Sequence, residues 1–439
     1  MPPQNGDRQA YTDGTKRIIL IFILSLAGKK NLQRRTKQMS KKETRWSRRN
    51  FLKTTAAAGL GSIIAPMAGL ARTADRGSVV PTRSFGKTGA DVSILSLGGM
   101  FNIASNQLLM KQAIDWGVTY WDTADCYQRG SEKGIGKFFN RQPNVREKIF
   151  LVSKSDARDP DGMTRLLNRS LNRLKTDYID LYFVHGIYRI DELDNQTRAW
   201  AEKTKAAGKI RFFGFSTHSN MEECLLEGAR LGWIDGIMMT YNYRLMHSDD
   251  MRRAVDACVK AGIGLTAMKT QGGGQVRTNS ETELKLAGRF LQKGFTDAQA
   301  KLKAVWQNPN IASICSQMPN MTILMSNVAA ALDKTQLSTR DTSLLQRYAK
   351  ETRSAYCTGC TAICESCVEG NAPIGDVMRY LMYCNSYNDY ELAAAEFKQI
   401  PHKIRKSLTR LDYSRAERKC PQGLPIARLM QEAAKKFKT

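Results

Sequence analysis

The chain has 439 residues, of which 42% are hydrophobic and 25% charged, and its 33 glycines and 12 prolines exclude collagen-like and low-complexity classes. The formal net charge is +26, a value that suggests nucleic acid or an anionic membrane as a partner until the charge is located. Residues 1–74 carry 15 Lys and Arg against 3 Asp and Glu, whereas the remainder has no basic run interleaved with aromatic residues. We therefore expect no nucleic-acid partner.

The N-terminal segment has the layout of a targeting signal. The apolar run Ile18–Ala27 has ten residues, roughly half of what a membrane-spanning helix needs, so we expect no stable transmembrane span. Further on, Ser47–Lys53 reads SRRNFLK and precedes Thr54–Ala71, a weakly apolar stretch rich in Ala and Gly. A basic region, an apolar region and then small residues, in this order, are typical of a signal peptide.

The segment SRRNFLK resembles the twin-arginine motif at every fixed position, with Arg48 and Arg49 as the paired arginines. The resemblance implies that residues 1–75 direct the folded protein to the twin-arginine export machinery and that the mature protein is periplasmic. Met39, just upstream of the motif, is an alternative start of translation. The competing interpretation is a disordered basic tail with a chance pair of arginines, which would leave the protein in the cytoplasm.

Eight short apolar runs begin after residue 92. They are near-continuous rather than alternating, as expected for parallel strands that are buried on both faces. We predict strands at Ile94–Leu97, Val118–Trp121, Ile149–Val152, Ile179–Val184, Ile210–Phe215, Ile234–Met239, Ile263–Ala267 and Ile311–Cys315.

Helical patterns separate most of these runs. They cover TRLLNRSLNRL (164–174) and the stretches near 107–116, 196–207, 221–231, 250–261 and 284–305. Four of them are followed by a glycine where a helix C-cap glycine belongs, at Gly117, Gly208, Gly232 and Gly262. Eight β/α units over residues 79–332 predict a (β/α)8 TIM barrel, an α/β fold. The alternative is a doubly wound open sheet, but no G-x-G-x-x-G follows the first run.

In a TIM barrel the chemistry lies at the carboxyl ends of the strands. Three of the runs are followed closely by a polar residue: Asp122 after the second, Lys154 after the third and His185 after the fourth. The phenol of Tyr127 lies in the loop after Asp122. A free phenol, with a pKa of about 10, protonates an alkoxide poorly near neutral pH. We expect the Lys154 ammonium to lower that pKa, Asp122 to hold the ammonium, and the imidazole to donate to a substrate carbonyl. This combination predicts reduction of a carbonyl by an external hydride donor.

Several longer segments carry a family resemblance. They are RSFGKTGADVSILSLGG (83–99), GVTYWDTADCYQRGSEKGIGK (117–137), IFLVSK (149–154), YIDLYFVH (178–185), GKIRFFGFSTH (208–218), YN (241–242) and GIGLTAMK (262–269). Through them residues 81–330 resemble the aldo/keto reductase family. The resemblance implies that Asp122, Tyr127, Lys154 and His185 form the family's catalytic tetrad, with Tyr127 as the proton donor. Taken singly, Asp122 could equally cap a turn and His185 could equally be a core histidine.

The same resemblance implies that NADP(H) or NAD(H) binds in an extended form across the barrel mouth. The positions that would hold it are Ser216, Asn242, Met268, Lys269, Gly272, Gly273 and Asn327. Gly272–Gly274 would let backbone N–H groups approach phosphate, and a mobile loop is the alternative. Met268 and Met238 depart from the aromatic and the Gln that many members place there. The segment 316–327 has no Arg or Lys for a 2′-phosphate, so NADP and NAD both stay open.

Residues 335–439 form a second, purely helical and Cys-rich unit. Cys357, Cys360, Cys364 and Cys367 lie within eleven residues, and Cys420 is followed by Pro421. Thiolates at these spacings suit a [4Fe–4S] cluster, with zinc or a metal-free helical cap as alternatives. The unit resembles the ferredoxin-like extension of some aldo/keto reductases, although Val368 rather than Pro follows Cys367. We favour ligation by Cys357, Cys360, Cys364 and Cys420 over the four local cysteines, because Cys-Pro recurs at the closing ligand of such clusters.

These observations predict an exported, NAD(P)H-dependent oxidoreductase that reduces a small-molecule carbonyl to an alcohol, or catalyses the reverse. Two rivals stay open. The first is an iron–sulfur redox module in which the cluster, and not nicotinamide, delivers the electrons. The second is a non-catalytic binding protein on a barrel whose active site has been retired, which the departures at the cofactor positions permit.

Overall fold

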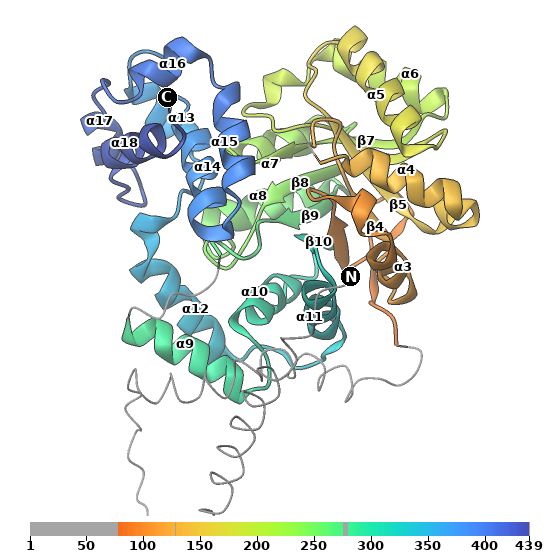
Figure 1. Cartoon of the computed structure of the whole chain (residues 1–439), viewed down its shortest axis with the longest axis horizontal. Coiled ribbons are helices and arrows are strands. Elements are labelled where there is room, and N and C mark those ends of the chain that lie inside the picture. Colours follow the sequence, from red (N-terminus) through yellow and green to blue (C-terminus); the bar gives the residue numbers. More distant parts are fainter. Residues whose placement is uncertain (1–77, 128, 275–279, 439) are drawn as a thin grey trace, which may run out of the picture. The chain divides into compact units, whose positions relative to one another are not determined.

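The computed structural model of the protein describes residues 78–127, 129–274 and 280–438. Its centre is a closed barrel of eight parallel strands with helices around it (Figure 1). The predicted targeting segment, residues 1–75 with Arg48 and Arg49, lies outside the described residues. Among the helices that are described, none is both long enough and apolar enough to span a bilayer.

The (β/α)8 barrel predicted from the sequence is confirmed. Each of the eight apolar runs overlaps a strand, consecutive strands pair in parallel, and the last strand closes the ring against the first. The runs lack polar alternation because each strand faces side chains of the barrel interior and the surrounding helices; β5 and β6 are buried along their whole length. The barrel strands are β3 (Leu95–Gly98), β4 (Tyr120–Asp122), β5 (Phe150–Ser155), β6 (Ile179–Val184), β7 (Ile210–Thr217), β8 (Gly236–Thr240), β9 (Gly264–Met268) and β10 (Ser313–Gln317).

A short antiparallel hairpin, β1 (Thr82–Ser84) with β2 (Asp91–Ser93), precedes the barrel and was not among the predicted strands. Phe85, at the start of its turn, is fully buried beside the first residues of β8 and β9. A Cβ added to Gly264 would lie 2.4 Å from the Phe85 ring, so a glycine is required where this ring enters. The hairpin therefore closes the end of the barrel opposite to the carboxyl ends of the strands.

The helices around the barrel follow the predicted stretches with one correction. The stretch 284–305 is two helices, because the chain turns at Gly294 (φ 87°) and Thr296 caps a new helix through the backbone of Gln299. The helices are α3 (Gln107–Asp115), α4 (Ser131–Arg141), α5 (Pro160–Leu174), α6 (Asn195–Ala206), α7 (Met221–Arg230), α8 (Asp249–Lys260), α9 (Glu281–Gln292), α10 (Asp297–Trp306) and α11 (Met321–Leu332).

The described residues after α11 are helical, as predicted. Asp341 of the first helix accepts hydrogen bonds from Arg289 and Lys293, so this helix packs on the barrel helix α9. The later helices enclose a separate apolar core that includes Cys364, Phe397 and Met430. The elements are α12 (Thr339–Glu351), α13 (Thr361–Cys364), α14 (Ile374–Tyr387), α15 (Tyr390–Gln399), α16 (His402–Ser407), α17 (Ser414–Lys419) and α18 (Ile426–Lys436).

Candidate active site

Three of the four predicted catalytic side chains meet at the carboxyl ends of β4 and β5. The ammonium of Lys154 donates to Asp122 Oδ1 at 2.5 Å and to the carbonyl oxygen of Thr123 at 2.8 Å, and lies 3.3 Å from the hydroxyl of Tyr127. Lys154 and Asp122 are 1% and 2% exposed, so the pair sits in a low-dielectric environment where its charges depend on each other. Parallel strands bring these residues together because their carboxyl ends share one rim.

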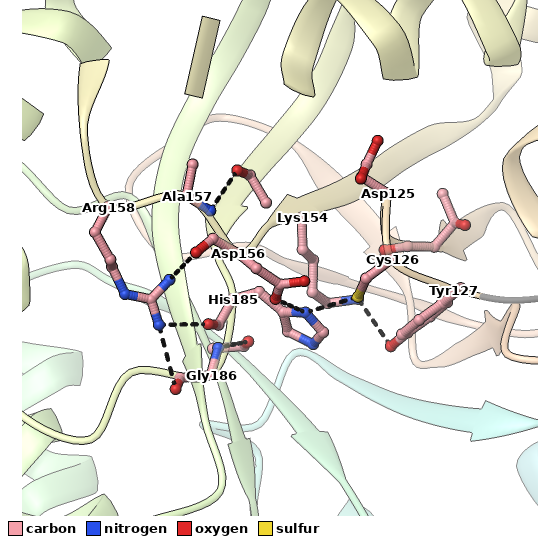
Figure 2. A network of polar contacts seen from close by, with 12 residues as sticks. Asp125, Cys126, Tyr127, Lys154, Asp156, Ala157, Arg158, His185 and Gly186 are labelled. Carbon is pink, nitrogen blue, oxygen red and sulfur yellow. Dashed lines mark hydrogen bonds and ion pairs between the residues drawn. The ribbon is translucent and has the colours of Figure 1, made fainter. Parts of the chain in front are cut away.

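The fourth predicted residue, His185, follows β6 on the same rim. Its ring meets the Tyr127 ring edge-on, with the two centroids 5.9 Å apart. Its Nδ1 atom lies 2.9 Å from Asp156 Oδ1 and 3.3 Å from Cys126 Sγ (Figure 2). The Nδ1 atom of His185, a carboxylate oxygen of Asp156 and the Sγ atom of Cys126 all lie within 4.8 Å of one another. Hydrogen bonds join the imidazole to the other two groups. Asp156 and Cys126 were not predicted, although each lies within four residues of a strand end, which is the signal that could have found them.

The pKa of Tyr127 moves in the direction opposite to the expectation. Burial, and then the Asp122 carboxylate, raise the pKa of Tyr127 well above its ordinary value. The Lys154 ammonium does not reverse this shift, because its closest contacts are to Asp122 and Thr123 and its charge is balanced there. The expected lowering of the Tyr127 pKa is therefore not found, and the phenol keeps its proton near neutral pH.

The predicted cofactor positions are occupied by contacts within the chain. Asn242 donates through Nδ2 to the Tyr356 hydroxyl at 2.9 Å and to the Lys269 carbonyl at 3.2 Å, and its Oδ1 accepts from the Arg244 backbone. Lys269 Nζ donates to the Tyr383 hydroxyl at 2.9 Å. Tyr356 and Tyr383 both come from the C-terminal unit, and no signal in the sequence pointed to either.

Three further predicted cofactor positions are also engaged. Ser216 is 1% exposed and its Oγ accepts from the backbone N–H of Gly186 at 3.0 Å. Asn327 donates to Ser316 Oγ at 3.0 Å. Met268 packs, together with the buried Met238, in the apolar core inside the barrel. In this arrangement the side chains at these three positions therefore make contacts within the barrel.

The glycine run faces side chains of the same chain rather than open space. A Cβ on Gly272 would lie 2.7 Å from the Tyr243 ring, and one on Gly273 would lie 3.0 Å from the Tyr356 ring. A Cβ on Gly274 would lie 2.9 Å from the Ser386 backbone oxygen. Gly273 and Gly274 thus leave room for the C-terminal unit, and Gly272 leaves room for the Tyr243 ring of the barrel. In this arrangement a nicotinamide dinucleotide at the predicted positions would have to displace Tyr356 from Asn242 and Tyr383 from Lys269.

The C-terminal cysteines separate into those that share a cavity and one that does not. Cys357, Cys360, Cys364 and Cys420 line one small cavity, while Cys367 is not among its lining residues and instead donates to the Ile363 carbonyl at 3.1 Å. Of the two predicted sets of cysteines, the structure therefore brings the one with Cys420 to a common cavity. Burial raises the pKa of Cys357 to about 12, so without a metal this thiol keeps its proton.

The separation of these sulfurs bears on the choice of metal. Four thiolates about 2.3 Å from one zinc ion lie about 3.8 Å from one another. Among the described residues, the only three metal-ligating side chains with donor atoms all within 4.8 Å of one another are Cys126, Asp156 and His185, so no three of the cavity cysteines are that close. In this arrangement the cavity cysteines are therefore farther apart than the ligands of a single zinc ion.

A larger cavity, of about 190 Å³, joins the cysteine site to the barrel mouth. Its lining includes His218, Thr240 and Lys269 from the strand ends and Arg379 from α14. Cys357 lines this cavity as well as the smaller one. The barrel mouth and the cysteine site therefore share a wall.

Comparison with known proteins supports the same interpretation of the barrel. The uncharacterized oxidoreductase YqkF of Bacillus subtilis is 27% identical over 302 residues, which cover 61% of this chain and 96% of that protein. The aldo-keto reductase yakc [NADP(+)] of Schizosaccharomyces pombe is 33% identical over 156 residues, 31% of this chain and 45% of that one. The solved structure of the thermostable aldo-keto reductase Tm1743, in complex with the inhibitor epalrestat, is 26% identical with a TM-score of 0.52 and covers 61% of this chain and 99% of that one.

The family model for the aldo/keto reductase family matches residues 95–339, more than half of the chain. That range contains all eight barrel strands and the four side chains at their carboxyl ends. It ends at the first residue of α12, before the cysteines. The chain belongs to the aldo/keto reductase family.

Proposed function

We propose that this oxidoreductase interconverts a small-molecule carbonyl compound and its alcohol, with Tyr127 as the proton donor. The observation that carries the proposal is the position of Lys154 Nζ, which reaches both Asp122 and Tyr127 at the barrel rim. Family membership supports it, as do relatives whose names describe oxidoreductases and aldo-keto reductases.

The chain's own groups have distinct proton roles in this proposal. Tyr127 keeps its proton because burial raises its pKa. An alkoxide oxygen is a much stronger base than a phenolate, so a substrate alkoxide still takes the proton from Tyr127. The phenolate left behind is stabilised by the Lys154 ammonium, 3.3 Å away, which Asp122 holds in place.

The family implies NADP(H) or NAD(H) as the source or acceptor of hydride, and the NADP(+) in the name of the S. pombe relative supports the former. Binding of a dinucleotide across the barrel mouth requires that Tyr356 and Tyr383 leave Asn242 and Lys269. The absence of an Arg or Lys in 316–327 leaves the discrimination of a 2′-phosphate to other residues.

We further propose that Cys357, Cys360, Cys364 and Cys420 hold a [4Fe–4S] cluster. Their shared cavity and their wide separation support this choice over zinc and over Cys367 as the fourth ligand. When bound, such a cluster supplies one-electron transfer. Iron and acid-labile sulfide in protein purified without air would support the cluster, whereas stoichiometric zinc without sulfide would refute it.

A second candidate function is favoured by one observation, the presence of Cys357 in the walls of both cavities. An external reductant would then supply two electrons in succession at the cysteine site. These electrons, together with two protons from the solvent, would reduce a carbonyl compound in the larger cavity to its alcohol. Nucleotide-free protein that is reduced by dithionite and reoxidised by a carbonyl compound would favour this function over hydride transfer.

We also propose that the protein is exported through the twin-arginine route, on the basis of Arg48 and Arg49 in SRRNFLK. Replacing both by Lys should leave folded precursor in the cytoplasm, as cell fractionation would reveal. Unchanged export of the double variant would refute the proposal.

The proposed reaction is tested at Tyr127. Tyr127→Phe should lower carbonyl reduction by about 10²–10⁴-fold, the range for loss of a general acid, with an unchanged unfolding midpoint. The matched control is Tyr178→Phe, the same change just before the amino end of β6, where Arg146 stacks on the ring. Turnover of Tyr127→Phe within threefold of the control would refute the role of the phenol.

A further inference from the structure

The two nitrogens of the His185 ring have different surroundings. Nδ1 lies 2.9 Å from Asp156 Oδ1 and 3.3 Å from the thiol of Cys126 (Figure 2). Within the described residues no hydrogen bond reaches Nε2. The side chain is 16% exposed, so part of the ring is open to solvent at the rim of the barrel.

The chemistry of the Asp156 side chain decides which nitrogen carries the proton. An ionised carboxylate only accepts hydrogen bonds, so a 2.9 Å contact requires hydrogen on Nδ1. Burial opposes ionisation of Asp156, but the hydrogen bond from His185 and its charge outweigh burial and lower the pKa of Asp156. The carboxylate is therefore the form present near neutral pH.

Cys126 does not compete for this role. Loss of water around its sulfur, and then the Asp156 charge, raise the pKa of the Cys126 thiol. The group therefore keeps its S–H and donates it to the Asp156 carboxylate, so the thiol does not donate to Nδ1, and its sulfur is a weak acceptor beside a carboxylate. The proton on Nδ1 is shared with Asp156.

We propose that Asp156 is a positioning residue that keeps the proton of neutral His185 on Nδ1, so that Nε2 accepts a hydrogen bond from a substrate hydroxyl and can donate to a substrate carbonyl only when the ring is an imidazolium. The inference rests on the proposed carbonyl–alcohol reaction and deepens it. It revises the expectation that the neutral imidazole donates to the carbonyl.

This arrangement separates the two directions of the reaction by pH. A neutral His185 suits the alcohol, which has an O–H to donate, whereas polarisation of a carbonyl needs the protonated ring. Burial lowers the pKa of His185 while Asp156 raises it, and the net direction is downward. Carbonyl reduction should therefore lose about tenfold per pH unit once the pH exceeds that pKa.

Other charged groups around the ring do not change this sign. The groups that face His185 or Asp156 come from two strands, three loops and one helix. They are Asp122 of β4, Lys154 of β5, Cys126 and Tyr127 of the loop after β4, Arg158 of the loop after β5, His218 of the loop after β7 and Glu396 of α15. Burial, followed by several neighbouring cations, lowers the pKa of His218 well below its ordinary value, so this ring stays neutral through the relevant range. The hydrogen bond to Asp156 is the only contact that fixes the tautomer among the described residues.

The tautomer can be observed without any substrate. The full chain has only four histidines, so ¹⁵N spectra of protein labelled on the histidine ring contain few signals, and His185→Gln identifies that of His185. The wild type near pH 7.5 should show N–H at Nδ1 and a bare Nε2. Asp156→Ala should shift the population toward Nε2–H. A wild-type ring with its proton on Nε2, or a ring unchanged in Asp156→Ala, would overturn the inference.

The activity measurement adds a second readout. Asp156→Ala should flatten the alkaline fall of carbonyl reduction, because its neutral His185 can donate from Nε2. The Asp156 side chain is 57% exposed, so the variant should fold. Asp161→Ala, at an exposed position in the first turn of α5, removes the same charge and should keep the wild-type pH profile. An equal pH profile in Asp156→Ala and the wild type would overturn the inference. Spectra as expected with no carbonyl turnover in any variant would instead refute the proposed function.

Discussion

The two halves of the barrel mouth differ in what their side chains contact. At the ends of β4, β5 and β6 the polar groups contact one another, as in the ion pair of Asp122 with Lys154. At the ends of β8 and β9 the polar groups contact a segment more than a hundred residues away, as in the hydrogen bond of Asn242 to Tyr356. In the first half the tetrad pairs within the barrel, although a neighbouring loop residue, Arg129, also binds Asp389 of the C-terminal unit. In the other half the partners themselves come from that unit.

The difference teaches what a barrel scaffold supplies by itself. Side chains at neighbouring strand ends are held close by the backbone pairing, so their chemistry follows from the order of the strands. A polar side chain that points away from the other strand ends takes its hydrogen-bond partner from the segment that packs over the barrel mouth. The first half therefore holds the residues of the proposed reaction, while the contacts of the second depend on this chain's C-terminal unit.

The largest expected effect would break the ion pair of Asp122 with Lys154 in the first half. Lys154→Met leaves the Asp122 carboxylate buried without its cation and should destabilise the fold by about 3–5 kcal/mol. Urea unfolding at pH 7.5 measures the loss of stability. The double variant Lys154→Met with Asp122→Asn should recover much of the loss; equal stability of the single variant and the wild type would contradict the coupling.

The next effect tests the unit that completes the other half. Cys420→Ser should abolish bound iron and sulfide in protein purified without air, whereas Cys367→Ser should retain both, because only Cys420 lines the cavity. Iron analysis and visible absorbance read the outcome. The reverse result, with iron lost in Cys367→Ser and kept in Cys420→Ser, would assign the site to the four local cysteines.

The smallest effect sharpens the contact between the two units. Tyr356→Phe frees the Asn242 amide from one hydrogen bond, worth about 1 kcal/mol, so NADPH should bind about fivefold more tightly. Tryptophan fluorescence titration measures the affinity. The matched control is Tyr413→Phe, which removes a hydrogen bond to the Leu408 carbonyl inside the C-terminal unit and should leave the affinity unchanged. Weaker binding in Tyr356→Phe would mean that its hydroxyl supports the nucleotide.

The sequence predicts the barrel well because burial on both faces leaves a direct trace in near-continuous runs such as Ile179–Val184. It also predicts that Asp122 and Lys154 meet, since both lie at strand ends. It does not predict the partners of Asn242 and Lys269, because Tyr356 lies in the loop between α12 and α13 and Tyr383 in α14, and the packing of these segments on the barrel leaves no periodic pattern. The direction of the Tyr127 pKa was missed for a related reason: spacing reveals a nearby ammonium but not the desolvation that outweighs it.

The closure of the barrel has a consequence for how the chain folds. Ile314 of β10 pairs with Leu95 of β3, over two hundred residues earlier in the chain. Until residues 313–317 have been synthesised, β3 and β9 both end the sheet with unpaired backbone N–H and C=O groups, which can pair with another molecule. Such distant pairing is also slow. Between the synthesis of β4 and that of β10 the nascent chain can therefore expose an open sheet edge, and this interval is when the protein most needs protection from aggregation.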